Sequence, residues 1–126
     1  MRTIKFRGKD KNNIWVYGFL NVQDYFTEII NLDVRTEVEH DTVGQFTWLY
    51  DKNGTEIYEG DILVCDEEPN VHFEVFWDRY NAAFSLLIID NNHEDIPYVN
   101  FTLAQALEEY NSLRVIGNTI DNKNLK

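Results

Sequence analysis

Apolar and polar residues alternate along much of the chain, which predicts a protein built mainly from short β-strands. The clearest signal lies in residues 43–65, VGQFTWLYDKNGTEIYEGDILVC. Residues 45–50 indicate a strand with Trp48 on its more aromatic side, and DKNG at 51–54 supplies the Asn-Gly pair that favours a tight hairpin turn. Ile57 and Tyr58 resume the apolar pattern on the return strand. A second turn at 59–61 then leads into an apolar strand at 62–65.

The N-terminal third predicts a hairpin followed by a less regular segment. Residues 3–7 alternate, with Ile4 and Phe6 on one face and Lys5 and Arg7 on the other. A polar turn separates them from an apolar strand at 14–20. We predict that residues 21–42 are irregular with short strands.

The remaining residues predict a second β region with one helix. Thr102 and Gln105 form the pattern of a capping box, which places a helix at about 102–112. The other elements that we predict are an acidic loop ended by a proline at 66–70, paired strands at 71–77 and 83–89, a polar loop at 90–95, at most a short edge strand at 97–99, a closing strand at 113–120 and a tail at 121–126.

These patterns define a fold class, mainly β with one short α-helix. We expect either a small bent antiparallel sheet or an SH3-like barrel, with an N-terminal hairpin and one helix near the C-terminus. A chain of 126 residues is long enough for one domain with its own core. We therefore predict a single domain over 1–126, made of the hairpin and irregular segment at 1–42, a β core at 43–120 and the tail.

The composition predicts a cytoplasmic protein. The sequence has no apolar run long enough for a membrane helix, and its first residues turn polar at once, unlike a signal peptide. Cys65 is the single cysteine and lies in an apolar strand, so we interpret it as a buried structural thiol.

Charge is distributed unevenly in this acidic protein, whose net charge is −11. Residues 1–11 carry five basic and one acidic side chain, which is +4, and residues 12–126 carry 6 basic and 21 acidic ones, which is −15. Most of the surface therefore repels nucleic acid. We interpret the basic residues as an exposed face or edge that guards against unwanted strand pairing, with phosphate binding as the alternative. They are Arg2, Lys5, Arg7, Lys9 and Lys11.

Candidate chemistry is sparse. His40, His72 and His93 do not have metal-ligand spacing, and we interpret the acidic residues beside His93 as a solvated loop. The sequence has no phosphate-binding loop, dinucleotide turn or hydrolase signature. We therefore predict no catalytic residue, cofactor or metal, and a protein that is not an enzyme.

Several segments resemble the YopX family of phage and prophage proteins. They are IKFR at 4–7 with Asp10, VGQFT at 43–47, DKNG at 51–54, EIYEGDI at 56–62, VFWD at 75–78 and VIGN at 115–118. Where the family usually has a small residue and then Leu, this chain has Trp48 and Leu49. The resemblance implies a mostly β protein of mobile elements that acts in the bacterial cytoplasm, and it implies no known activity. The shared residues lie in predicted turns and core strands, so they suggest a signature of the fold.

The leading functional hypothesis is a non-enzymatic module that binds other protein surfaces and self-associates as a homo-oligomer. The basic N-terminus of one copy could pair with the acidic body of another, and aromatic strands could supply an apolar interface. The candidate interaction residues are the five basic ones together with Trp15, Trp48 and Trp77. The alternatives are an acidic mimic of nucleic acid that inhibits a host DNA-binding protein, a nucleic-acid binder that uses the basic N-terminus, and binding to another host or phage protein.

Overall fold

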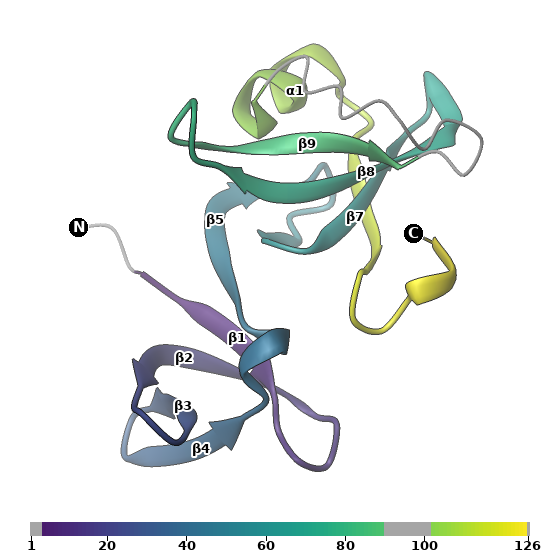
Figure 1. The fold of residues 1–126 in the computed structure, drawn as a ribbon. Coiled ribbons are helices and arrows are strands. Elements are labelled where there is room, and N and C mark those ends of the chain that lie inside the picture. The colour runs from purple at the N-terminus through teal and green to yellow at the C-terminus, as the bar shows by residue number, and fades with distance from the viewer. Residues whose placement is uncertain (1–3, 90–101, 126) are drawn as a thin grey trace. The chain divides into compact units, whose positions relative to one another are not determined.

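The computed structural model describes residues 4–89 and 102–125, and the chain divides into two compact units, Met1–Phe46 and Thr47–Lys126. Figure 1 shows the strands and helix α1. In the N-terminal unit the elements are β1 (Phe6–Lys9), β2 (Trp15–Val22), β3 (Thr27–Asn31), β4 (Val34–Val38), the 3-10 helix η1 (His40–Thr42) and the start of β5 (Gly44–Tyr50). In the C-terminal unit they are the rest of β5, β6 (Glu56–Tyr58), β7 (Asp61–Cys65), β8 (Glu68–Asp78), β9 (Ala83–Ile89), α1 (Leu103–Glu109), β10 (Arg114–Asn118) and the 3-10 helix η2 (Lys123–Leu125).

All of the paired strands are antiparallel, and they form two open sheets with no closed barrel among the described residues. The strand order is β4-β3-β2-β1-β5-β6 in one sheet and β10-β7-β8-β9 in the other. Strand β5 passes from the first unit into the second. The mainly β fold class is confirmed, with two antiparallel sheets and, among the described residues, no SH3-like closed barrel.

The N-terminal unit consists of successive hairpins that pack around a small apolar core. Ile29 and Val38 are 1% and 6% exposed and lie on the inner face of β3 and β4. A Cβ on Gly8 would lie only 3.1 Å from Val38 and 3.3 Å from Ile29, so the absence of a side chain there lets β1 approach this core. Gly18 in β2 has φ +156, and a Cβ there would collide with the carbonyl oxygen of Ile30.

The C-terminal unit has the larger core. It is made by β6 to β10 and α1, and the buried residues that pack together are Ile57, Leu63, Cys65, Phe73, Val75, Leu86, Leu103, Ala106 and Leu113. Helix α1 contacts β9, and the isolated bridge between Ser85 and Thr102 joins them where the helix begins. Irregular registers between β7 and β8 and between β7 and β10 bend the sheet, because bulges increase the local twist.

Several predicted elements are confirmed. Asp51 accepts hydrogen bonds from the turn between β5 and β6, so the DKNG hairpin forms as expected. Strands β8 and β9 pair in the expected hairpin. The capping box is also present, since the Thr102 hydroxyl accepts from the Gln105 amide and the Gln105 side chain accepts from the Thr102 amide. Cys65 is buried, as predicted.

Several elements differ from the prediction, among them the first strand, which was expected at 3–7 and runs over Phe6–Lys9. Strand β8 begins at Glu68, so Pro69 lies inside the first residues of the strand and does not end a loop. Residues 27–38 contain short strands as expected, β3 and β4, but these pair in a regular hairpin and are not irregular. The helix ends at Glu109. The presumed tail contains η2, and the Asn118 side chain accepts hydrogen bonds from two amides of the turn before it.

The polar loop at 90–95, with its candidate metal ligands around His93, and the short strand at 97–99 lie outside the described residues. In the part of the chain that the structure describes, no helix is long and apolar enough to cross a membrane.

Candidate functional site

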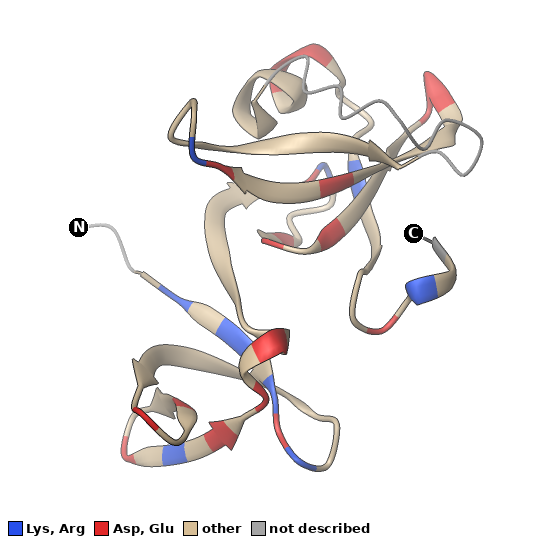
Figure 2. Cartoon of the chain, viewed as in Figure 1, with Lys and Arg blue, Asp and Glu red and all other residues tan. Residues whose placement is uncertain are grey.

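The basic residues of β1 do not form an exposed face, and this part of the sequence interpretation is wrong. Strand β1 lies between β2 and β5, and Arg7 and Lys9 are only 8% and 6% exposed. Both cations stack on Trp15 of β2, with the Arg7 Cζ 4.5 Å and the Lys9 Nζ 4.8 Å from the ring centroid. Lys5 lies over the Phe46 ring at 5.2 Å. Figure 2 shows the resulting band of basic residues along β1.

This placement follows from hydrogen bonding on both edges of β1. Alternation shows that β1 has two faces, but whether the charged face meets solvent depends on the neighbouring strands. Lys9 also donates from its Nζ to the Asn13 carbonyl at 3.1 Å, which satisfies part of its charge locally. The first eleven residues therefore contain a structural strand.

The other candidate interaction residues belong to other segments of the chain. Lys11 is exposed in the turn after β1, and Arg2 lies outside the described residues. Trp48 and Trp77 belong to the C-terminal unit. Trp77 is 48% exposed and packs edge-on against Phe84, with ring centroids 5.1 Å apart. The structure thus places Lys5, Arg7 and Lys9 near β1, with Trp15 of β2 beside Arg7 and Lys9.

An apolar hollow on the N-terminal unit was not predicted. It has a volume of about 430 Å³ and lies beside β2, β3 and β4. Tyr17, Leu32 and Val34 stand on its rim and are 39%, 90% and 64% exposed, whereas the buried Ile29 also lines it. Large apolar side chains gathered at one place on a surface mark binding sites more often than single exposed ones do.

Leu32 breaks two local preferences at once. It lies in the turn between β3 and β4 with φ +54, a conformation that a bulky side chain rarely adopts and that Asn or Gly adopts readily. It also exposes nearly its whole side chain to water. A residue held against its backbone preference is a reason to look for a function there.

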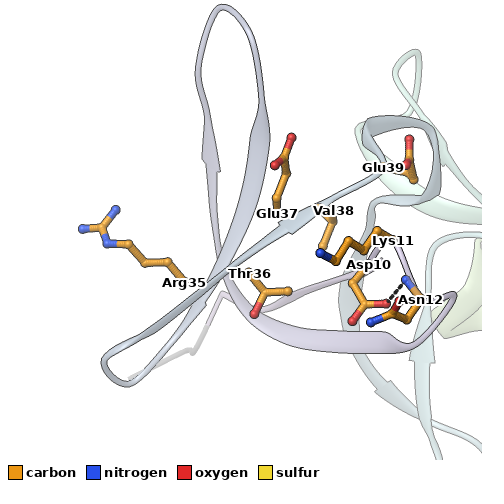
Figure 3. Close-up of a pocket in the computed structure, with 8 residues that line it drawn as sticks. All are labelled: Asp10, Lys11, Asn12, Arg35, Thr36, Glu37, Val38 and Glu39. Carbon is orange, nitrogen blue, oxygen red and sulfur yellow. Dashed lines mark hydrogen bonds between the residues drawn. The ribbon is translucent and has the colours of Figure 1, made fainter.

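A second hollow of about 420 Å³ lies along β4, between that strand and the turn after β1 (Figure 3). Its lining is mostly polar: Asp10, Lys11, Asn12, Arg35, Thr36, Glu37, Val38 and Glu39. Figure 3 shows Thr36 and Glu37 pointing to opposite sides of β4. The hollow borders an edge strand, β4, that carries a positive charge at Arg35 and a negative charge at Glu37.

The Glu28 carboxylate, near this edge, contacts two neighbouring side chains. Glu28 of β3 accepts a hydrogen bond from Asn21 at 2.9 Å and forms an ion pair with Arg35 at 2.8 Å. The Asn21 hydrogen bond, followed by Arg35, lowers the pKa of Glu28 below its ordinary value. Glu37 lies directly opposite Glu28 in the pairing of β3 with β4, and its side chain makes no hydrogen bond or ion pair within the described residues.

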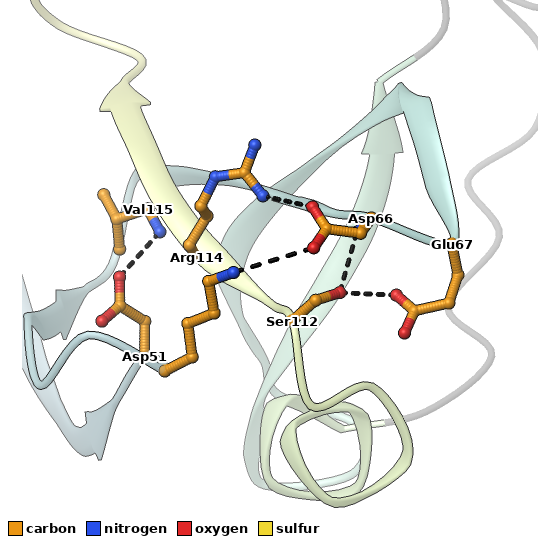
Figure 4. Close-up of polar contacts among 7 residues, drawn as sticks. Asp51, Asp66, Glu67, Ser112, Arg114 and Val115 are labelled. Atoms are coloured by element: carbon orange, nitrogen blue, oxygen red, sulfur yellow. Dashed lines mark hydrogen bonds and ion pairs between the residues drawn. The ribbon is translucent and has the colours of Figure 1, made fainter.

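In the C-terminal unit the acidic residues of the family-like segments support the fold. Asp51 accepts from the amides of Asn53, Thr55 and Val115 at 2.8, 2.9 and 3.0 Å, which ties the DKNG turn to β10 (Figure 4). Asp61 accepts from the Tyr58 amide at 2.7 Å. These carboxylates hold backbone groups, as expected if the signature records the fold.

A polar cluster surrounds the turn between β7 and β8. Arg114 pairs with Asp66 at 2.8 Å, and Ser112 donates to Glu67 at 2.6 Å (Figure 4). The Ser112 hydrogen bond lowers the pKa of Glu67, and burial raises the pKa of the neighbouring Cys65 thiol. A thiol whose burial favours the protonated form is a poor nucleophile at neutral pH. Within residues 4–89 and 102–125, no group of three or more His, Cys, Asp or Glu side chains gathers as a metal site would require.

The comparisons with known proteins agree with the fold described above. The sequence matches the YopX protein family over residues 5–125, and the chain belongs to that family. Protein EF1440 from Enterococcus faecalis, known from a crystal structure, is similar with a TM-score of 0.61 and 24% sequence identity, over 99% of each chain. At that identity the likeness shows the fold alone. No curated protein matches the chain.

Proposed function

We propose that this YopX-family protein is a non-enzymatic protein-interaction module that associates with itself, and that it serves as a phage or prophage accessory protein in the bacterial cytoplasm. The observation that carries the proposal is Leu32. Its apolar side chain is 90% exposed at the rim of an apolar hollow, on a backbone with φ +54. Binding to a protein surface would remove this side chain from water and would explain why an unfavourable residue occupies the turn.

Other features of the N-terminal unit agree with this role. Nine of the 13 exposed large apolar side chains among the described residues lie in residues 4–34. In addition to the three rim residues they include Ile14, Phe19 and Val22. Nucleic acid has less support as a partner, because Arg7 and Lys9 are buried against Trp15 and do not form a free basic arm.

The test is the solution mass of the full chain by light scattering and sedimentation over a wide range of concentrations. We expect an oligomer that dissociates on dilution. Leu32→Asn should weaken association, and because Asn suits a positive φ, it should leave the fold intact or more stable. The matched control is Tyr80→Asn, which removes a side chain that is 86% exposed in the C-terminal unit and should leave the mass unchanged.

A wild-type chain that remains monomeric at every concentration would refute self-association. An oligomer that Leu32→Asn and Tyr80→Asn affect equally would show that the hollow is not part of the interface. Truncation of residues 1–11 is not a suitable test, because it removes β1 from the middle of its sheet.

A further inference from the structure

Strand β4 is the outer strand of its sheet, and its hydrogen-bonding pattern can be worked out from the turn that precedes it. Asn31 of β3 pairs with Val34 of β4 across a turn of two residues. Such a turn is closed by hydrogen bonds between the paired residues. Since the backbone groups alternate along an antiparallel strand, Val34, Thr36 and Val38 bond to β3, and the N–H and C=O groups of Arg35 and Glu37 point away from it.

The next residue whose backbone groups should point away from β3 supports this assignment. Glu39 lies two positions beyond Glu37, and its amide donates to the Lys9 carbonyl at 2.8 Å, on the side away from β3. Among the described residues, no backbone hydrogen bond reaches Arg35 or Glu37 on the same side. The outer edge of β4 is therefore occupied at one end and open over Arg35 to Glu37, beside the hollow in Figure 3.

The sequence of this edge reads nearly the same from both ends, apart from an exchange of charge. It is VRTEV, with Thr36 at its centre, Arg35 and Glu37 on either side and a valine at each end. If a second copy of β4 runs antiparallel about a twofold axis at Thr36, each Arg35 lies opposite the partner's Glu37. The two valines of each copy also lie opposite each other. Arg35 and Glu37 are the residues whose backbone groups point outward. This register therefore allows four backbone hydrogen bonds and two opposite-charge pairs between the copies.

We propose that β4 is the self-association surface of this protein, and that its occupant is β4 of a second copy, paired antiparallel about a twofold axis at Thr36. A contact of this kind is self-complementary, as twofold dimers require. It is also an instance of strand addition to an open sheet edge. The inference rests on the proposed self-association and specifies the strand and register that carry it.

The charges favour this pairing over an unpaired edge. Within one chain Glu37 faces the like charge of Glu28, whose carboxylate is already paired with Arg35. The Arg35 side chain is 65% exposed, so it can contact a second carboxylate without leaving the first. In the dimer the partner's Glu37 supplies that carboxylate, and Arg35 of the partner neutralises Glu37.

The first test reverses one charge. Glu37→Arg should weaken association about tenfold or more, because each Arg35 then faces an arginine of the other copy. The variant should fold at least as well as the wild type, since Arg at this position lies opposite Glu28. The matched control is Glu109→Arg, which makes the same change in net charge on the exposed end of α1 and should leave association unchanged.

The second test restores the pairing. The double variant Arg35→Glu with Glu37→Arg exchanges the two charges and keeps them complementary about the same axis. It should recover association to within about twofold to threefold of the wild type, as expected for a pairwise contact. A double variant that stays as weak as the single one would overturn the proposed register.

The third test reads the backbone. Amide hydrogen exchange at Arg35 and Glu37 should slow as protein concentration rises, whereas the Thr36 amide, bonded to β3, should be protected at every concentration. Association without these changes would overturn the β4 contact and leave self-association through another surface. A chain that is monomeric at every concentration would overturn both the contact and the proposed function.

Discussion

The Asp51 carboxylate predicts a large loss of stability when its charge is removed. Its Oδ1 accepts from the Asn53 and Thr55 amides, and its Oδ2 accepts from the Val115 amide of β10. In Asp51→Asn, the side-chain oxygen can serve either the turn or β10. The NH₂ group then faces another N–H donor on the remaining side.

The magnitude follows from that mismatch. Hydrogen bonds to a charged group contribute about 1.5–3 kcal/mol, and a buried donor that loses its acceptor costs about 1–3 kcal/mol. Asp51 is only 7% exposed, so water does not readily replace the lost contact. We expect Asp51→Asn to lower the free energy of unfolding of the C-terminal unit by about 2–3 kcal/mol, a large share of the roughly 5–15 kcal/mol typical of a domain.

The matched control is Asp66→Asn. This carboxylate lies in the same region and pairs with Arg114 at 2.8 Å and Lys52 at 3.7 Å, but its side chain is 63% exposed (Figure 4). Exposed ion pairs contribute about 0–1 kcal/mol, so Asp66→Asn should cost less than about 1 kcal/mol.

The assay is urea unfolding followed by circular dichroism. Amide exchange in the β8–β9 hairpin reports on the C-terminal unit, and exchange at Val115 reports on the contact with Asp51. Local exchange is needed because two compact units need not unfold in one transition. The reasoning would be refuted if Asp51→Asn cost no more than Asp66→Asn, or if the Val115 amide kept its protection in the Asp51→Asn chain.

Three further predictions concern single side chains. Gly18→Ala should lower the stability of the N-terminal unit by about 1–3 kcal/mol in thermal unfolding, because its Cβ would collide with β3, and a variant as stable as the wild type would contradict this. The pKa of Glu28, lowered by Asn21 and then Arg35, is lower in the folded chain than unfolded, so its ionised form adds stability above the ordinary value of 4.5. That stability is lost as pH falls below 4.5 and through the lowered pKa of Glu28. Glu28→Gln should remove this part of the pH dependence, as measured by urea unfolding between about pH 3 and 7. Burial raises the pKa of Cys65, so iodoacetamide should alkylate the folded chain far more slowly than the urea-unfolded chain, and equal rates would contradict the burial.

Local sequence signals predicted much of the fold. The Asn-Gly pair in DKNG and the capping box at Thr102 and Gln105 specify hydrogen bonds within a few residues, and both appear as expected. Pro69 misled the prediction because a proline often ends a loop, yet it is compatible with the first residues of a strand. The prediction that the basic face of β1 is exposed was wrong. Alternation separates Arg7 and Lys9 from Phe6, but it does not show which face of the strand other residues cover.

The candidate site was mostly beyond sequence reasoning. Leu32 lies between Asn31 and Asp33, a turn-forming context, but a leucine gives no sign of a positive φ or of nearly complete exposure. Both properties come from the pairing of β3 with β4. One signal was available: VRTEV is symmetric in residue type and opposite in charge about Thr36, and this becomes informative once β4 is known to be an edge strand.

The position of β10 in the second sheet has a consequence for synthesis of the chain. All five residues of β7, Asp61–Cys65, are buried, and β10 covers one edge of that strand. On the ribosome, β7 emerges well before Arg114–Asn118 of β10, so for that interval an apolar strand has an open edge. Such an edge favours aggregation. The edge of β7 is therefore covered only once β10 has been synthesised and has paired with it.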